Sequence, residues 1–89
     1  MVEIILDVRD LEPPEPYERA TAALQLLQTG QYVRMIAPRR PRLLYPWLAE
    51  RGFCEDTRQR GEDLYEIFIW SAVDIETGKR IAALAHAQR

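Results

Sequence analysis

Three arginines stand close together near the middle of the chain, at Arg39, Arg40 and Arg42. A guanidinium group keeps its charge and offers paired N–H donors that match carboxylate or phosphate oxygens. These arginines precede a predicted helix, whose first-turn amides and dipole also favour an anion. The spacing therefore predicts an anion-binding loop. The alternative is a solvated basic loop that the acidic N-terminal loop, Glu50 or Glu55 neutralises.

Cysteine and histidine, which often carry chemistry, occur once each, as Cys54 and His86. A reactive thiolate needs a neighbouring cation or a helix N-terminus, whereas Cys54 is followed by Glu55 and Asp56. We therefore expect an unreactive cysteine. His86 has no second histidine and no acid at helical spacing, so we expect a surface residue there. No metal site and no cofactor are predicted, because these residues have no metal-ligand spacing.

Acidic residues gather around the start of the first predicted helix, at Asp7, Asp10, Glu12 and Glu15. Paired carboxylates can act as general acid and base, but only inside a pocket that so short a chain hardly encloses. Carboxylates at a helix start also favour the dipole and cap free amides. We expect capping here, and we predict that the protein is not an enzyme.

Length and composition limit the remaining possibilities. The chain has 89 residues, 47% of them hydrophobic, which is enough for one small domain. It has no apolar run of about 18 residues and no basic leader, so we expect neither membrane insertion nor secretion, and we predict a cytoplasmic location. The net charge of −2 does not favour nucleic acid as a partner.

The N-terminal half predicts a strand–helix–strand unit. Residues Val2–Leu6 form a short apolar run typical of a strand. Apolar residues then recur at three- and four-residue spacing, which predicts an amphipathic helix with a proline in its first turn. Gly30 is expected to end this helix in the left-handed conformation. Tyr32–Ile36 fits a second strand, which carries Arg34 and which Pro38 stops.

The following residues predict a second helix and a hairpin. The helix begins between residues 42 and 45, since Pro46 is tolerated only in the first turn, and it ends at Gly52. Phe53–Arg58 and Leu64–Ser71 fit antiparallel strands joined by a turn at residues 60–63. Right-handed crossovers place both helices on one face of the sheet.

The predicted fold class is α+β. We expect a two-layer α/β sandwich of βαβαββ order, with a four-stranded mixed sheet and two helices on one face. Residues 1–71 form this domain, and residues 72–89 are expected to form a helical C-terminal extension.

The last predicted strand is apolar on both faces. Alternation places Leu64, Phe68 and Trp70 on the face away from the two helices. Leaving the Phe and the Trp in water forgoes about 2 kcal/mol of burial each, so a cover is expected. Two covers are predicted with equal weight: the C-terminal helix, or a second copy of the chain in a homodimer. A third interpretation leaves the aromatic pair partly exposed.

The loop before the first helix reads Leu11-Glu12-Pro13-Pro14-Glu15-Pro16. It resembles the signature of the TusA/SirA-like superfamily of sulfur carriers, which reads Leu-x-Cys-Pro-x-Pro and whose cysteine carries a persulfide. Pro13 stands where that thiol belongs. The resemblance covers residues 4–71 and is nearest to an uncharacterised bacterial branch, a domain of unknown function that lacks the cysteine.

The resemblance implies a role in protein contacts. Because Pro13 has no thiol, persulfide transfer by the family mechanism is chemically impossible at this position. We expect a non-catalytic interaction or accessory domain with an unidentified protein partner. The expected partner-binding residues are Arg9, Glu12, Pro13, Pro14 and Glu15, next to the arginine loop.

Three alternatives remain. The arginine loop could sense an anion or small ligand, or Cys54 could serve as a relocated sulfur carrier. RNA binding ranks last, because no basic residues are interleaved with the aromatics of the last strand.

Overall fold

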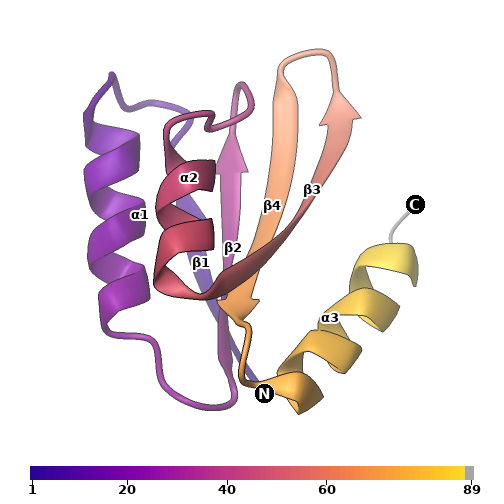
Figure 1. The fold of residues 1–89 in the computed structure, drawn as a ribbon. Helices are drawn as coiled ribbons and strands as arrows, with labels where there is room; N and C mark the ends of the chain where they lie inside the picture. Colours follow the sequence, from indigo (N-terminus) through magenta and orange to yellow (C-terminus); the bar gives the residue numbers. More distant parts are fainter. Residues whose placement is uncertain (88–89) are drawn as a thin grey trace.

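The computed structural model describes residues 1–87, and the side chains of the last helix as far as Leu84. Figure 1 shows the elements in chain order. Their bounds are β1 Val2–Asp7, α1 Glu15–Gln25, β2 Gln31–Ala37, α2 Leu44–Arg51, β3 Phe53–Gly61, β4 Leu64–Ser71 and α3 Ile75–Ala87. The predicted order of strands and helices, with a helical extension at the C-terminal end, is confirmed.

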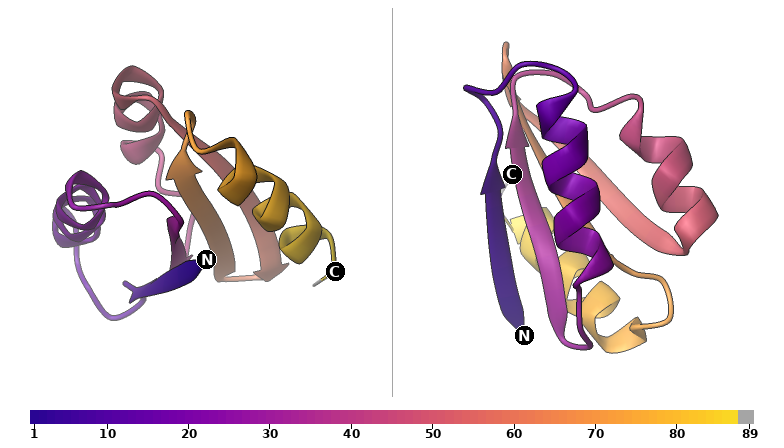
Figure 2. Two further views of the ribbon diagram at one scale, coloured as in Figure 1. Left: turned by 90° about the horizontal axis from the view of Figure 1, so that it is seen from below. Right: turned by 90° about the vertical axis from the view of Figure 1, so that its left-hand side faces the viewer.

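The four strands form one mixed sheet in the order β1-β2-β4-β3. β1 and β2 are parallel, and β4 pairs antiparallel with both β2 and β3. Helices α1 and α2 cover one face, while α3 lies on the other (Figure 2). The structure therefore has the predicted two-layer sandwich, with α3 added across the second face.

The main core lies between the sheet and helices α1 and α2. Alternate residues of β2 face this layer, and Val33, Met35 and Ala37 are all buried. Leu24 of α1 and Leu48 of α2 meet them from the helical side. The period-2 pattern of the strands and the three- and four-residue pattern of the helices therefore define the two sides of one core.

The two glycines with positive φ act differently from one another. Gly52, with φ of 81°, ends α2 as predicted. Gly30, with φ of 86°, was expected to end α1, but α1 already stops at Gln25. The amides of Leu26 and Leu27 bond to carbonyls three residues back, which tightens the last helical turn. Gly30 instead lies in the separate turn that leads into β2.

The hairpin between β3 and β4 is tighter than expected. β3 continues to Gly61, so the turn contains only Glu62 and Asp63. The pairing register shifts between Gln59 and Gly61, and this bulge absorbs the extra strand residue. The four-residue turn predicted at 60–63 is therefore wrong, because a bulged strand lengthened the ladder.

The second face of the sheet is covered in part by α3. Tyr32, Phe68 and Ile81 are buried together there, and Trp70 and Leu84 pack against them. This arrangement matches the extension alternative. Phe68 is 0% exposed, so its side chain is not available to a second copy of the chain while α3 stays docked. The predicted homodimer contact at Phe68 is therefore corrected, because the chain's own helix fills that place.

The other expected members of this face differ from Phe68. Leu64 is only partly buried and lies outside the cluster under α3, near the opposite end of β4. Trp70 is partly exposed. The expectations that Ala85 belongs to the apolar stripe of the C-terminal helix and that His86 lies on the surface concern side chains outside the described ones.

Ion pairs occupy the part of this face that α3 leaves open. Arg34 of β2 donates to Glu3 of β1 (3.1 Å) and to Glu66 of β4 (2.7 Å). Arg60 of β3 also donates to Glu66 (3.0 Å). Burial, together with a hydrogen bond to Glu3, raises the pKa of Tyr32 at the edge of this network. The second face is therefore half apolar and half charged.

In the part of the chain that the structure describes, no helix is long and apolar enough to cross a membrane.

Asp74 fixes the start of α3. Its carboxylate accepts hydrogen bonds from the Thr77 hydroxyl (2.7 Å) and amide (3.3 Å), and from the Gly30 amide (2.8 Å). The Gly30 amide, followed by Thr77, lowers the pKa of Asp74 below its ordinary value of 3.8. The charged carboxylate therefore stabilises the docked helix above that pH, and this contribution is lost as the pH falls through the lowered pKa.

We predict that acid loosens α3 through Asp74. Below about pH 4 the indole N–H signal of Trp70 should shift in NMR spectra. Asp74→Asn keeps an oxygen acceptor for Thr77 but does not titrate, so its spectra should change less with acid. Equal acid dependence in both proteins would show that other carboxylates release the helix.

Gly78 allows α3 to pass close to Trp70. A Cβ placed on Gly78 would lie 2.7 Å from Nε1 of the Trp70 indole. Gly78→Ala gains about 1 kcal/mol of helix propensity, but the clash costs about 1–3 kcal/mol. We predict a lower midpoint in chemical unfolding and a shifted Trp70 indole signal. Lys79 is the exposed neighbour of Gly78, and the control substitution Lys79→Ala should leave the unfolding midpoint and the Trp70 signal unaltered. A more stable Gly78→Ala protein with an unchanged indole signal would contradict the close approach.

Candidate binding cleft

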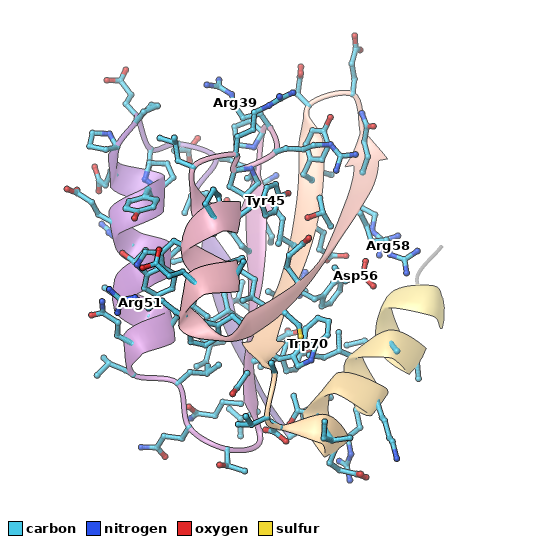
Figure 3. The ribbon with its side chains drawn as sticks, viewed as in Figure 1. Arg39, Tyr45, Arg51, Asp56, Arg58 and Trp70 are labelled. Carbon is cyan, nitrogen blue, oxygen red and sulfur yellow. The ribbon has the colours of Figure 1, made fainter. Side chains whose placement is uncertain are left out.

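Two loops meet at one end of the sheet. Because β1 and β2 are parallel neighbours, the loop at residues 8–14 and the loop at residues 38–43 both leave the carboxyl ends of their strands. Figure 1 shows these loops together at the top of the molecule, and Figure 3 places Arg39 there. Open α/β sheets usually bind ligands at this edge.

An open cleft of about 770 Å³ lies between the two loops, and we call it the proline–arginine cleft. Its apolar lining includes Leu11, Tyr17, Met35, Leu44 and Tyr65. Its polar lining is the set Arg9, Glu12, Arg39, Arg40 and Arg42. Its size lies in the range of pockets that hold a drug-sized ligand.

The three predicted anion-binding arginines all line this cleft. Arg39, Arg40 and Arg42 are exposed, and none of them makes an ion pair with a carboxylate among the described residues. Glu55, one of the expected neutralising residues, accepts a hydrogen bond from Thr57 instead (2.7 Å). The rim of the cleft therefore carries positive charge that the described part of the chain does not pair.

Arg40 differs from the other two in its contact with an aromatic ring. Its guanidinium carbon lies 5.3 Å from the centroid of the Tyr65 ring, which is cation–π range. The contact keeps the charge and restricts the side chain. Arg40 is thus oriented by the cleft itself, whereas Arg39 and Arg42 have no such ring contact among the described residues.

Four of the five predicted partner-binding residues line the same cleft: Arg9, Glu12, Pro13 and Pro14. The peptide bond between the two prolines is cis. Glu15 is the exception, since it begins α1 and pairs with Arg19 one turn further along (3.2 Å). The prediction of one shared face therefore matches the geometry, except at Glu15.

Arg9 is engaged by a neighbouring acid. It donates to both carboxylate oxygens of Asp7, at 3.0 and 2.7 Å. These hydrogen bonds from the Arg9 side chain, with one from its amide, lower the pKa of Asp7 to about 2. Arg9 therefore adds less free charge to the cleft than the three other arginines do.

The expected capping of α1 by acidic side chains is not found. Pro14 occupies the N-cap position, and no described side chain caps this helix. The carbonyl of Glu12 accepts the Glu15 amide (2.9 Å), so a backbone turn replaces the cap. Asp7 is turned toward Arg9 instead. The prediction of side-chain capping is wrong, because this backbone turn and Pro16, which has no amide, close the helix start. Glu15 does lie in the first turn, where its charge favours the helix dipole.

Arg34 does not belong to the cleft. It lies on β2, the strand that precedes the arginine loop. Alternation along β2 turns it to the second face, where it pairs with Glu3 and Glu66. Met35, its neighbour in sequence, faces the cleft instead.

A family comparison covers most of this architecture. Residues 5–71 match the family model of an uncharacterized conserved protein, DUF2249. The chain belongs to the DUF2249 family. No curated protein and no solved structure matches the chain significantly. The DUF2249 match includes both loops of the proline–arginine cleft and ends at Ser71, before α3 begins.

The single cysteine of this DUF2249 domain lies far from the cleft. Cys54 pairs with Trp70 across the sheet, whereas Tyr65 of the cleft lies near the other end of β4. Cys54 is a free, partly buried thiol. Its position on β3 also faces away from α1 and α2, since its neighbour Phe53 packs into the main core. The thiol therefore has no contact with the arginine loop.

Sequence reasoning missed the floor of the cleft. Tyr65 and Met35 line it, yet they come from strands that are far apart in sequence. They meet because β2 pairs with β4, which places Ala37 opposite Tyr65. The alternation of β4 did place Tyr65 on the helical face, but only the strand order shows that it lies next to the arginine loop.

The cleft of the DUF2249 domain combines binding groups of two kinds. Guanidinium groups at the rim can hold anionic groups, and the apolar floor can bury a side chain or ring. Its lining contains no serine, threonine, cysteine, histidine or lysine. Among the described residues, no group of three His, Cys, Asp or Glu residues could hold a metal ion.

Proposed function

We propose that this DUF2249 domain is a non-catalytic, TusA-like interaction domain that docks a partner protein in the proline–arginine cleft. The observation that carries the proposal is the convergence of the two loops. The segment that resembles the sulfur-carrier signature and the segment with three arginines, which have no carboxylate partner in the described part of the chain, line one open cleft.

The residue types in the cleft support binding over catalysis. Nucleophilic catalysis most often uses a serine, threonine, cysteine or lysine next to a base, and the lining contains none of these residues. Its side-chain hydroxyls are the phenols of Tyr17 and Tyr65, and no histidine or lysine that could act as a base lines the cleft with them. Glu12 is the only carboxylate in the lining, so it has no second acid with which to share general acid–base work. The arrangement favours recognition of charge and shape.

The prolines support a protein as the occupant. The chain has six prolines, and five of them line the cleft: Pro13, Pro14, Pro16, Pro38 and Pro41. Proline fixes the backbone φ angle, so these loops lose little freedom when a partner orders against them. Rigid apolar loops around a charged rim suit a docking surface.

Photo-crosslinking in the native cell tests this proposal. Leu43 is 78% exposed at the cleft, and Val73 is 88% exposed at the other end of the sheet. A photoreactive amino acid at position 43 should capture one discrete protein, and the same group at position 73 should not. No capture at position 43, or equal capture at both positions, would contradict docking in the cleft.

The proposal includes the absence of persulfide-carrier activity. We predict that incubation with a persulfide donor under mild conditions leaves Cys54 without a sulfur adduct in mass spectra. The reason is that no guanidinium of the arginine loop lies near this thiol to stabilise a thiolate. Cys54→Ser provides the zero-adduct reference. A stable adduct on Cys54 would restore the sulfur-carrier alternative.

A second candidate function is the binding of a small anion. The observation that favours it is the lack of carboxylate partners for Arg39, Arg40 and Arg42 among the described residues. Calorimetry with pyrophosphate at low salt should then show saturable binding that Arg40→Ala and Arg42→Ala abolish. Binding that ignores both substitutions would remove this candidate.

A further inference from the structure

We propose, resting on the docking function above, that the proline–arginine cleft takes an acidic, extended segment of its partner that carries one bulky apolar side chain. Carboxylates of the segment meet Arg39 and Arg42 at the rim. The apolar side chain packs on the floor of the cleft, where Leu11, Tyr17 and Tyr65 are partly exposed.

Charge complementarity decides the polar part of this occupant. The whole chain has a net charge of −2, yet three arginines stand at the cleft without a carboxylate partner among residues 1–84. The fourth, Arg9, is already paired with Asp7. A local excess of positive charge on an acidic protein steers an acidic partner to this one surface and repels basic ones.

Size and lining decide the apolar part. A volume of about 770 Å³ is much larger than a single inorganic anion needs, and most of the lining is apolar. Leu11 and Tyr17 offer partly exposed apolar surface, and Tyr65 offers a ring that Arg40 covers on one side. An apolar side chain buried here would anchor the segment, as central apolar residues do in other interfaces.

An extended chain fits the two features better than a compact anion. Side chains of an extended segment alternate in direction, so carboxylates can point to the rim while an intervening side chain points to the floor. Arg39 and Arg42 are separated by two residues, and the two carboxylates that flank the apolar side chain share one side of the segment and can face these arginines. A lone phosphate would leave the floor empty.

Calorimetry with three blocked pentapeptides tests the inference. The first has four glutamates around a central leucine, the second replaces the leucine with glycine, and the third replaces the glutamates with lysines. We expect saturable one-to-one binding of the first at about 50 mM NaCl, and much weaker binding at about 300 mM. The glycine peptide should bind about tenfold more weakly, and the lysine peptide should not bind.

Two protein variants localise the interaction. The double substitution Arg39→Ala with Arg42→Ala should lower the affinity for the glutamate–leucine peptide by about tenfold or more. Lys79→Ala with Arg80→Ala removes the same charge from exposed positions of α3 and should leave the affinity unchanged. Equal losses in the two variants would overturn the inference.

The outcomes separate this inference from the docking function. If the peptide does not bind but position 43 still captures a partner, the acidic segment is wrong and docking stands. If pyrophosphate binds as tightly as the peptide, or if leucine and glycine peptides bind equally, the site is a small-anion site and the inference fails. If neither capture nor peptide binding occurs, both proposals fail.

Discussion

Removal of residues 74–89 is expected to make the protein self-associate and lose solubility. The truncation strips α3 from Tyr32, Phe68 and Trp70, which it covers in the intact chain. An exposed apolar patch on a sheet face promotes association. Each fully buried side chain that becomes exposed costs about 1.5–3 kcal/mol, so the free energy of unfolding should fall by several kcal/mol, a large part of the total for a small domain.

Light scattering after gel filtration and denaturant unfolding measure this effect. Removal of residues 85–89 alone is the matched control, because it keeps Ile81 and Leu84 in the cluster. This shorter truncation should behave like the full chain. Unchanged size and stability of the protein that lacks residues 74–89 would mean that α3 contributes little to the cover of the second face.

The second large effect is expected from reversing charge at the cleft. The double substitution Arg39→Glu with Arg42→Glu should abolish capture of the partner at position 43. It should also lower the affinity for the glutamate–leucine peptide by about a hundredfold, since attraction becomes repulsion. Both side chains are exposed and lack ion pairs among the described residues, so the free energy of unfolding should change by less than about 0.5 kcal/mol. Crosslinking and calorimetry on the same preparations give the result.

Lys79→Glu with Arg80→Glu is the control for this reversal. Each replacement changes the charge by −2, so both double variants move the net charge from −2 to −6. The α3 variant should keep capture and peptide binding. Loss in both variants would indicate a response to total charge, and no loss in the cleft variant would show that these arginines do not take part.

Most of the fold could be predicted from the sequence, because its elements have local signals. Alternation in β2, the helical spacing in α1 and the left-handed Gly52 each have a physical cause within a few residues. The end of α1 was missed, since a tightened last turn competes with the glycine signal at Gly30. The sequence left open whether the C-terminal helix or a second copy of the chain covers the second face. Only the packing in the structure shows that Ile81 reaches Phe68.

The cleft was predictable in part. Parallel neighbouring strands end at the same edge, so the loops that contain Pro13 and Arg40 could be placed on one face. The pairing of Arg9 with Asp7 depends on the conformation of one short turn, and the contribution of Tyr65 depends on strand order. Neither has a signal in the spacing of residues. The polar neighbours and the floor of the cleft therefore required the structure.

Hydrogen–deuterium exchange on the complex captured from the native cell tests most directly whether the two loops act as one binding surface. We predict that the amides of residues 8–12 and of residues 39–43 gain protection together when the partner is bound, while the exposed turn at residues 62–63 exchanges as it does in the free protein. Protection of only one loop, or protection confined to α3 and β3, would contradict a partner seated in the proline–arginine cleft.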